Sequence, residues 1–415
     1  MQADRIDPRV LICYSAFAIP LALAALPVYV YAPALYAERE HLPLAQLGAA
    51  LLAARLFDAL IDPMLGRWVD STRGKGYRRH ISLALPLLGG GFVALFNPPL
   101  LDQGNALVWL LASLMLVHWG HSLGGIAYQS WGASLAHLRS QRALVAGSRE
   151  ACGLLGVIAA AVLPAAIGLP GLCIVFLLAL AAAAWLLLGF GARAACAAHD
   201  AAEQSVSAFL PLTNPVFRKL LAVFICNGIA AAIPATLFSF FARDRLQLGG
   251  TSGFFLAAYF LAGAASMPLW IMLARRHGEA RAWLFSMLLA LLAFCGAYTL
   301  GPGDVSSFAL ICVMSGLALG ADLALPPALL TAVIHRAGHG GQREGSYFGL
   351  WNWATKMNLA IAAGAALPVL AWLGYTPGHA SAQGQHALSL AYAALPCAFK
   401  AAALALLAAF RFDDT

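Results

Sequence analysis

The sequence predicts an all-α polytopic membrane protein, with twelve transmembrane helices in two six-helix halves. Of its 415 residues, 61% are hydrophobic and only 10% are charged, whereas a soluble protein carries about a quarter charged residues. Apolar runs of about 20 residues recur from end to end, and each is long enough to cross a hydrocarbon core of about 30 Å. Features of the first half of the chain also recur in the second half.

The apolar runs define the expected helices in order along the chain. The first nine residues are polar, and the long, proline-containing apolar stretch behind them is typical of a first spanning helix. We therefore expect no cleavable signal peptide. The twelve predicted spans lie near 10–36, 43–68, 81–98, 105–135, 143–167, 170–192, 215–242, 250–274, 281–300, 305–334, 345–373 and 386–411.

Basic residues alternate between the two sides of these predicted spans. One set of connections is rich in arginine and lysine, and the opposite set is nearly bare, with Arg39, Arg243 and Arg245 as exceptions. By the positive-inside rule both termini are cytoplasmic, in a cell membrane such as the bacterial inner membrane. The net charge of +7 therefore reflects topology, and no nucleic acid partner is expected. The basic set comprises Arg5, Arg9, Arg73, Lys75, Arg78, Arg79, Arg139, Arg142, Arg193, Arg218, Lys219, Arg275, Arg276, Arg281, Arg336 and Arg343.

An internal repeat divides the chain into two halves. When the sequence is slid by about 205 residues, Pro63 faces Pro268; at a slightly shorter offset, Gly120 faces Gly316. The predicted division is an N-terminal half over 1–192, a cytoplasmic linker over 193–214 and a C-terminal half over 215–415. Two parallel six-helix halves are the architecture of the major facilitator superfamily, whose substrates bind near the bilayer midplane between the halves.

Two aspartates, Asp58 and Asp62, lie one helical turn apart in an otherwise apolar segment. Carboxylates are costly in a bilayer and usually line polar cavities. Two acids this close favour a shared cation or a shared proton, and no acid takes their place near Pro268. One alternative is a structural ion pair with Arg55, three residues before Asp58. A single guanidinium does not readily neutralise two acids, so we favour a cation-binding site.

Other polar residues inside the spans are candidates for the substrate cavity. Lys356 lies mid-span and needs a partner, for which the two acids are candidates. Asp322 follows Gly320 and precedes two prolines, which favours a position facing the central cavity. His118 and His121 share a helix face but lack a third metal ligand, so no metal site is expected at the histidines. The one metal ion expected is Na⁺, at Asp58 and Asp62. The predicted cavity residues are Tyr29, His118, His121, Tyr128, Trp131, Arg149, Asp322, Trp351 and Asn352, although packing is an alternative role for each aromatic residue.

At these residues the chain resembles the glycoside–pentoside–hexuronide:cation symporters, the melibiose permease-like family of the major facilitator superfamily. The resemblance rests on Asp58-x-x-x-Asp62-Pro63-x-x-Gly66 and the basic run that follows it. Supporting matches extend over nearly the whole chain. They are the segment 127–132, Arg142, Arg149, Lys356 and the segment 373–377.

The resemblance implies roles for particular residues. Asp58 and Asp62 correspond to the cation-site carboxylates, Ser122 to a hydroxyl ligand and Lys356 to the basic group beside them, whereas Arg149 would lie at the cytoplasmic side of the pocket. The chain departs from the family pattern at Ala22 and Gly125, where melibiose permease holds its galactoside with acids, and at Ala332 and His335. A galactoside is therefore disfavoured as the substrate.

The expected function is secondary active transport: Na⁺- or H⁺-coupled symport of a small organic solute, sugar-like or amphipathic, by alternating access. No cofactor is expected apart from a bound Na⁺, and the chain is expected to act as a monomer in the bilayer. Three alternatives remain at this point. They are a proton-coupled exporter of amphipathic or lipid-like compounds, a membrane enzyme using His118 and His121, and a receptor that binds without transport.

Overall fold

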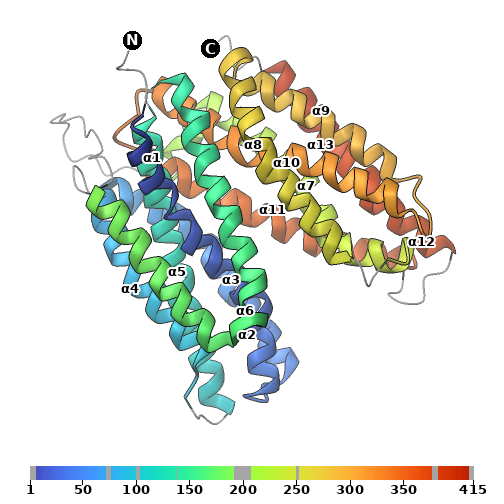
Figure 1. The fold of residues 1–415 in the computed structure, drawn as a ribbon, viewed down its shortest axis with the longest axis horizontal. Coiled ribbons are helices and arrows are strands. Elements are labelled where there is room, and N and C mark those ends of the chain that lie inside the picture. Colours follow the sequence, from blue (N-terminus) through green and yellow to red (C-terminus); the bar gives the residue numbers. More distant parts are fainter. Residues whose placement is uncertain are drawn as a thin grey trace. The chain divides into compact units, whose positions relative to one another are not determined.

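The computed structural model describes residues 6–71, 76–99, 103–136, 138–190, 207–248, 252–375 and 382–410. These residues form helices joined by short connections, and they contain no β-strand (Figure 1). The first helices are α1 (Pro8–Ser15), α2 (Ala18–Glu38), α3 (Leu44–Ser71), α4 (Gly76–Phe96), α5 (Gln103–Leu135) and α6 (Arg139–Phe190). After η1 (Leu210–Thr213) follow α7 (Pro215–Phe240), η2 (Phe241–Arg245), α8 (Ser252–His277), α9 (Glu279–Ala297), α10 (Val305–Arg336), α11 (Glu344–Trp372), α12 (Ala382–Ser389), η4 (Leu390–Ala394) and α13 (Leu395–Ala409).

The all-α membrane fold is confirmed. Within the described residues, ten helical stretches are long and apolar enough to cross a membrane. One long helix, α6, contributes two of them, because Gly168 adopts a φ of 69° and kinks the helix between the predicted spans 143–167 and 170–192. The two remaining predicted spans fall on α3 and α11, which have 28 and 29 residues but carry the polar residues of the predicted site.

The helices cluster into two compact units. The first comprises Met1–Pro211 with Ile334–Trp353, and the second comprises Leu212–Val333 with Ala354–Thr415. The end of α10 and the beginning of α11 therefore group with the first unit, because they pack on its helices. The predicted division into halves follows the repeat in the chain and stays a prediction. Residues 193–206 of the predicted linker lie outside the described residues.

Two glycines that the repeat pairs with each other lie at close helix contacts. A Cβ atom on Gly120 of α5 would overlap the backbone of Leu88 in α4. A Cβ atom on Gly316 of α10 would overlap the backbone carbonyl of Tyr259 in α8. Small residues at such crossings let membrane helices approach closely, which replaces the hydrophobic driving force that lipid cannot supply.

The end of α3 holds the beginning of α11 within the first unit. The Asp70 carboxylate accepts hydrogen bonds from the backbone N–H groups of Gly345 and Ser346, both at 2.7 Å, and from the Ser346 hydroxyl at 2.6 Å. These are N–H groups that the first turn of a helix cannot satisfy internally. Gly66 approaches Gly345 so closely that a Cβ atom would overlap the Gly345 carbonyl. Asp70 lies beyond the predicted spanning segment 43–68, and burial raises its pKa to about 7.

Candidate functional site

The helix α3 carries both aspartates of the predicted cation site into the interior of the first unit. Asp58 is 4% exposed and Asp62 is 0% exposed. Their spacing of four residues places them on one face of α3. Two buried carboxyl groups thus lie one turn apart in the middle of α3.

The neighbouring helix α5 supplies two polar partners for Asp58. The Ser122 hydroxyl donates to Asp58 Oδ1 at 2.9 Å, and His118 Nδ1 lies 3.4 Å from Asp58 Oδ2. His118 and Ser122 are also four residues apart, so both lie on the face of α5 that packs on α3. Ser122 and His118 are buried, whereas His121 is partly buried. Each oxygen of Asp58 therefore has a polar neighbour from α5.

An aromatic ring and a guanidinium group lie beside this cluster. The ring of Tyr29, from α2, lies 6.3 Å from the His118 ring, centroid to centroid. The Arg55 guanidinium lies over the Tyr29 ring, 4.8 Å from its centroid, in a cation–π contact. Tyr29 and Arg55 are both exposed, so they form the accessible side of a site whose acids are buried.

Asp62 lies at a close approach of α3 to the first turns of α11. A Cβ atom on Gly349 would come within 2.6 Å of the Asp62 carbonyl oxygen. Of the predicted cavity residues that follow in α11, Trp351 is buried and Asn352 is partly buried. Lys356, also partly buried, is the predicted charge partner of the acids; it belongs to the second unit, and its role stays a prediction.

The chemistry of the first-unit cluster suits a small monovalent cation or a proton. Carboxylate and hydroxyl oxygens are the ligands that hard cations such as Na⁺ prefer. An imidazole next to a carboxylate can instead share a proton with it. The residues that could ligate Na⁺ are Asp58, Asp62 and Ser122, and those that could take up a proton are Asp58, Asp62 and His118.

Other predicted cavity residues of the first unit lie in a separate polar cluster. The Tyr128 hydroxyl donates to the carbonyl of Tyr14 at 2.8 Å, and the Tyr14 hydroxyl donates back to the Tyr128 carbonyl at 3.2 Å. Trp131 is buried in the same region of α5. Arg149 of α6 donates through Nε to Glu150 at 3.0 Å. In this structure these side chains join α1, α5 and α6, and their predicted contact with a substrate is untested.

In the second unit, Asp322 has partners that the sequence did not reveal. Lys400 Nζ lies 2.8 Å from Asp322 Oδ2 and donates to Asn227 Oδ1 at 2.7 Å. Trp283 Nε1 donates to Asp322 Oδ1 at 2.7 Å. From its place in the last span, Lys400 is predicted to be structural. A lysine inside an apolar span is itself a signal that a buried acid is near, and here that acid is Asp322.

Comparisons with known proteins agree with this architecture. The MFS/sugar transport protein family matches residues 13–414. The "Uncharacterized symporter YjmB" of Bacillus subtilis (strain 168) is 27% identical over 136 residues, which are 31% of this chain and 29% of that protein. The chain thus aligns with less than a third of the length of this curated relative.

Two solved structures share the fold at low sequence identity. A bacterial homologue of the iron transporter ferroportin, in an outward-facing state, has a TM-score of 0.76 at 14% identity, with 98% of this chain and 99% of that chain covered. The Escherichia coli fucose:proton symporter FucP has a TM-score of 0.70 at 15% identity, with 95% and 98% covered. Because the family match spans nearly the whole chain, the hypothesis of a membrane enzyme is set aside: the chain belongs to the MFS/sugar transport protein family and is a membrane transporter of the major facilitator superfamily.

Proposed function

We propose that this transporter is a symporter that couples the uptake of a small organic solute to the binding of Na⁺ or H⁺ at Asp58 and Asp62. The observation that carries the proposal is the burial of both acids one turn apart, with Ser122 and His118 on the two oxygens of Asp58. The names of relatives add support, since one is a symporter and another a fucose:proton symporter.

The physical argument begins with the cost of the charges. An ionised carboxylate in a low-dielectric interior is strongly disfavoured unless it is paired or protonated. A bound monovalent cation offsets this cost, and the two acids together hold it better than one. The cation then favours the conformation in which the acids are occupied.

Coupling follows if that conformation also binds the solute better. A coupling free energy of about 1–3 kcal/mol corresponds to a roughly 5–150-fold change in solute affinity. Reciprocity requires that the solute raises the affinity for the cation by the same factor. The two halves then alternate access around the occupied site. In this proposal Lys356 and Arg55 are the coupling and charge partners of the two acids, as predicted from the sequence.

The test is uptake by Asp58→Asn and Asp62→Asn variants in proteoliposomes, with a Na⁺ gradient and a pH gradient imposed separately. A thermal-shift screen of sugars, glycosides, organic acids and lysolipids, with and without Na⁺, first identifies a solute that binds. Both variants are expected to bind the solute and to lose gradient-driven accumulation. Full accumulation by both variants under either gradient would disprove the coupling proposal.

Ser134 offers a matched control on the same helix. It is buried like Ser122, but its hydroxyl donates to the carbonyl of Trp131 in its own helix, at 2.7 Å. Ser122→Ala is expected to weaken the cation dependence of uptake, whereas Ser134→Ala is expected to leave it unchanged.

A proton-coupled exporter of amphipathic compounds is the second candidate. The observation that favours it is the apolar character at the positions where sugar-binding acids align: Ala22 is partly buried, and a Cβ atom on Gly125 would meet only open space. The direction of the imposed pH gradient separates the two functions. A symporter accumulates solute when protons flow in with it, whereas an antiporter expels solute under the same gradient.

A further inference from the structure

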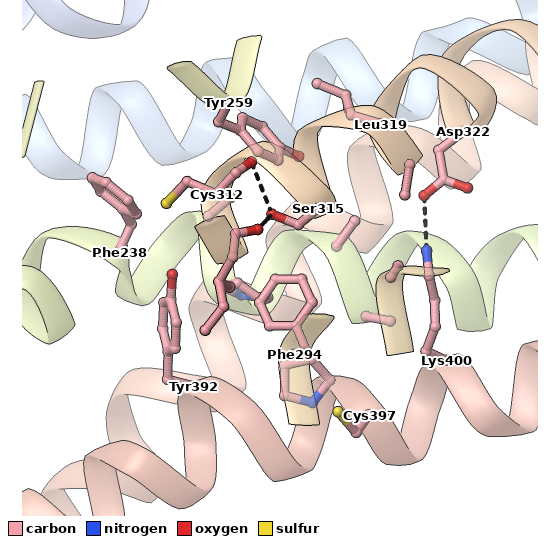
Figure 2. A pocket seen from close by; sticks show the side chains of 18 of the residues that line it. Phe238, Tyr259, Phe294, Cys312, Ser315, Leu319, Asp322, Tyr392, Cys397 and Lys400 are labelled. Atoms are coloured by element: carbon pink, nitrogen blue, oxygen red, sulfur yellow. Dashed lines mark hydrogen bonds and ion pairs between the residues drawn. The ribbon is translucent and has the colours of Figure 1, made fainter. Parts of the chain in front are cut away.

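A cavity of about 330 Å³ lies inside the second unit, and all of its lining residues come from that unit. The lining side chains come from α7, α8, α9, α10, η4 and α13 (Figure 2). Five of them are alanines, three on α7 and one each on α9 and α10. Interiors of helix bundles are normally filled to crystal-like density. The small alanine side chains on α7, α9 and α10 explain why the interior of this unit is not completely filled.

The two sides of the cavity differ in polarity. Among the residues that the structure describes, Asp322 and Lys400 are the only charged ones that line it, and they form an ion pair at one side in Figure 2. Phe238 and Tyr392 lie at the other side, and the ring of Phe294 lies between. The cavity is therefore amphipathic along its length, with aromatic walls and one ionic side.

The ionic side selects against charge. Lys400 and Asp322 neutralise each other, and their side chains are 8% and 13% exposed. A carboxylate or ammonium ligand has to break this pair and leaves one of its members buried without compensation. A hydroxyl group keeps the pair intact, because it can accept from the ammonium and donate to the carboxylate.

We propose that this cavity is a binding site for a neutral amphipathic molecule with a hydroxyl head at Asp322 and Lys400 and an aromatic or aliphatic body along Phe294 and Tyr392. Its size agrees with small-molecule pockets, which begin at about 300 Å³. An apolar cavity of about 150 Å³ already binds benzene, so a fused two-ring body fits here. The site is separate from the carboxylate pair of the first unit, and it binds whether or not Asp58 and Asp62 couple transport.

Native cysteines report occupancy without any transport assay. Cys397 lines the cavity and is partly exposed, whereas Cys226, on α7 in the same unit, is partly exposed and does not line it. The purified full chain in lipid nanodiscs is alkylated with N-ethylmaleimide, and the rate at each cysteine is read by mass spectrometry. The probe is 2-naphthol, a neutral two-ring hydroxyl compound; naphthalene-2-carboxylate is its charged counterpart.

We expect 2-naphthol at ten times its dissociation constant to slow alkylation of Cys397 about tenfold and to leave Cys226 unchanged. Naphthalene-2-carboxylate at the same concentration is expected to give no protection. Equal slowing at both cysteines would show partition into lipid and overturn the proposal. Equal protection by the carboxylate would overturn the argument from the ion pair.

Two blocking variants and a control complete the test. Ala290→Phe fills the cavity from α9, and Ala235→Phe fills it from an exposed position on α7, where folding is less at risk. Ala257→Phe adds the same ring to an exposed position of α8 outside the lining. Protection of Cys397 is expected to disappear in the folded blocking variants and to persist in the control. Protection that persists in Ala235→Phe refutes the site.

Discussion

The contact between the end of α3 and the start of α11 is expected to weaken as the pH rises. Asp70 accepts three hydrogen bonds from Gly345 and Ser346, yet burial raises its pKa from 3.8 to about 7. The group thus holds its proton more tightly in the contact than in water. A group of this kind stabilises the closed contact fully below its ordinary pKa, and that stability is lost as the pH rises through the raised pKa.

The magnitude follows from the two pKa values. At about 1.4 kcal/mol for each pH unit, the full difference between 3.8 and about 7 corresponds to about 4 kcal/mol. Between pH 5 and pH 8 the free energy of opening is expected to fall by up to about 3 kcal/mol. The neighbouring Glu344 acts in the same direction, because burial also raises its pKa.

Hydrogen exchange over residues 344–350, corrected for the intrinsic pH dependence of exchange, measures this opening. Protection of the Gly345 and Ser346 amides is expected to decrease from pH 5 to pH 8 in the native protein. Asp70→Asn keeps the shape of the side chain but cannot titrate, so its protection is expected to follow a flatter pH profile. Protection that increases with pH, or an identical slope in Asp70→Asn, would refute the reasoning.

Three further predictions concern individual contacts. Ser122→Ala removes a hydrogen bond to a carboxylate, which is worth about 1.5–3 kcal/mol. The cation concentration that gives half of the thermal stabilisation is therefore expected to rise about tenfold or more, and Ser134→Ala is the control. Lys400→Met leaves Asp322 buried without its charged partner and is expected to lower the free energy of unfolding by about 3–5 kcal/mol. The double variant Asp322→Leu with Lys400→Met is expected to recover most of that loss, as measured by thermal unfolding. Gly132→Ala places a methyl group onto the Tyr14 hydroxyl and is expected to cost about 1–3 kcal/mol; Gly90→Ala, where a Cβ atom meets open space, is the control.

Local properties of the sequence were enough to predict the fold class and the buried acids. Whether a run crosses a membrane depends on its own length and polarity, so the helices lie close to their predicted ranges. The kink in α6 falls between two predicted spans, because Gly168 can adopt a positive φ. The acids of α3 were expected to be buried because they lie inside a mainly apolar segment that is long enough to cross the membrane.

Contacts between helices were less predictable. Ser122 was placed near Asp58 only through the family resemblance, and the contact of His118 with Asp58 was not foreseen. The pair of Asp322 and Lys400 joins residues 78 positions apart, on α10 and α13, and only the tertiary structure brings them together.

The sequence alone determined that this protein is a polytopic helical membrane protein and that two neighbouring carboxylates of α3 are buried in it. The tertiary structure decided which groups those carboxylates and Asp322 meet. The reason is geometric: successive residues of a helix point about 100° apart, so a small rotation of one helix exchanges the side chains that face its neighbour. Burial is a property of a segment, whereas a partner depends on how two segments pack.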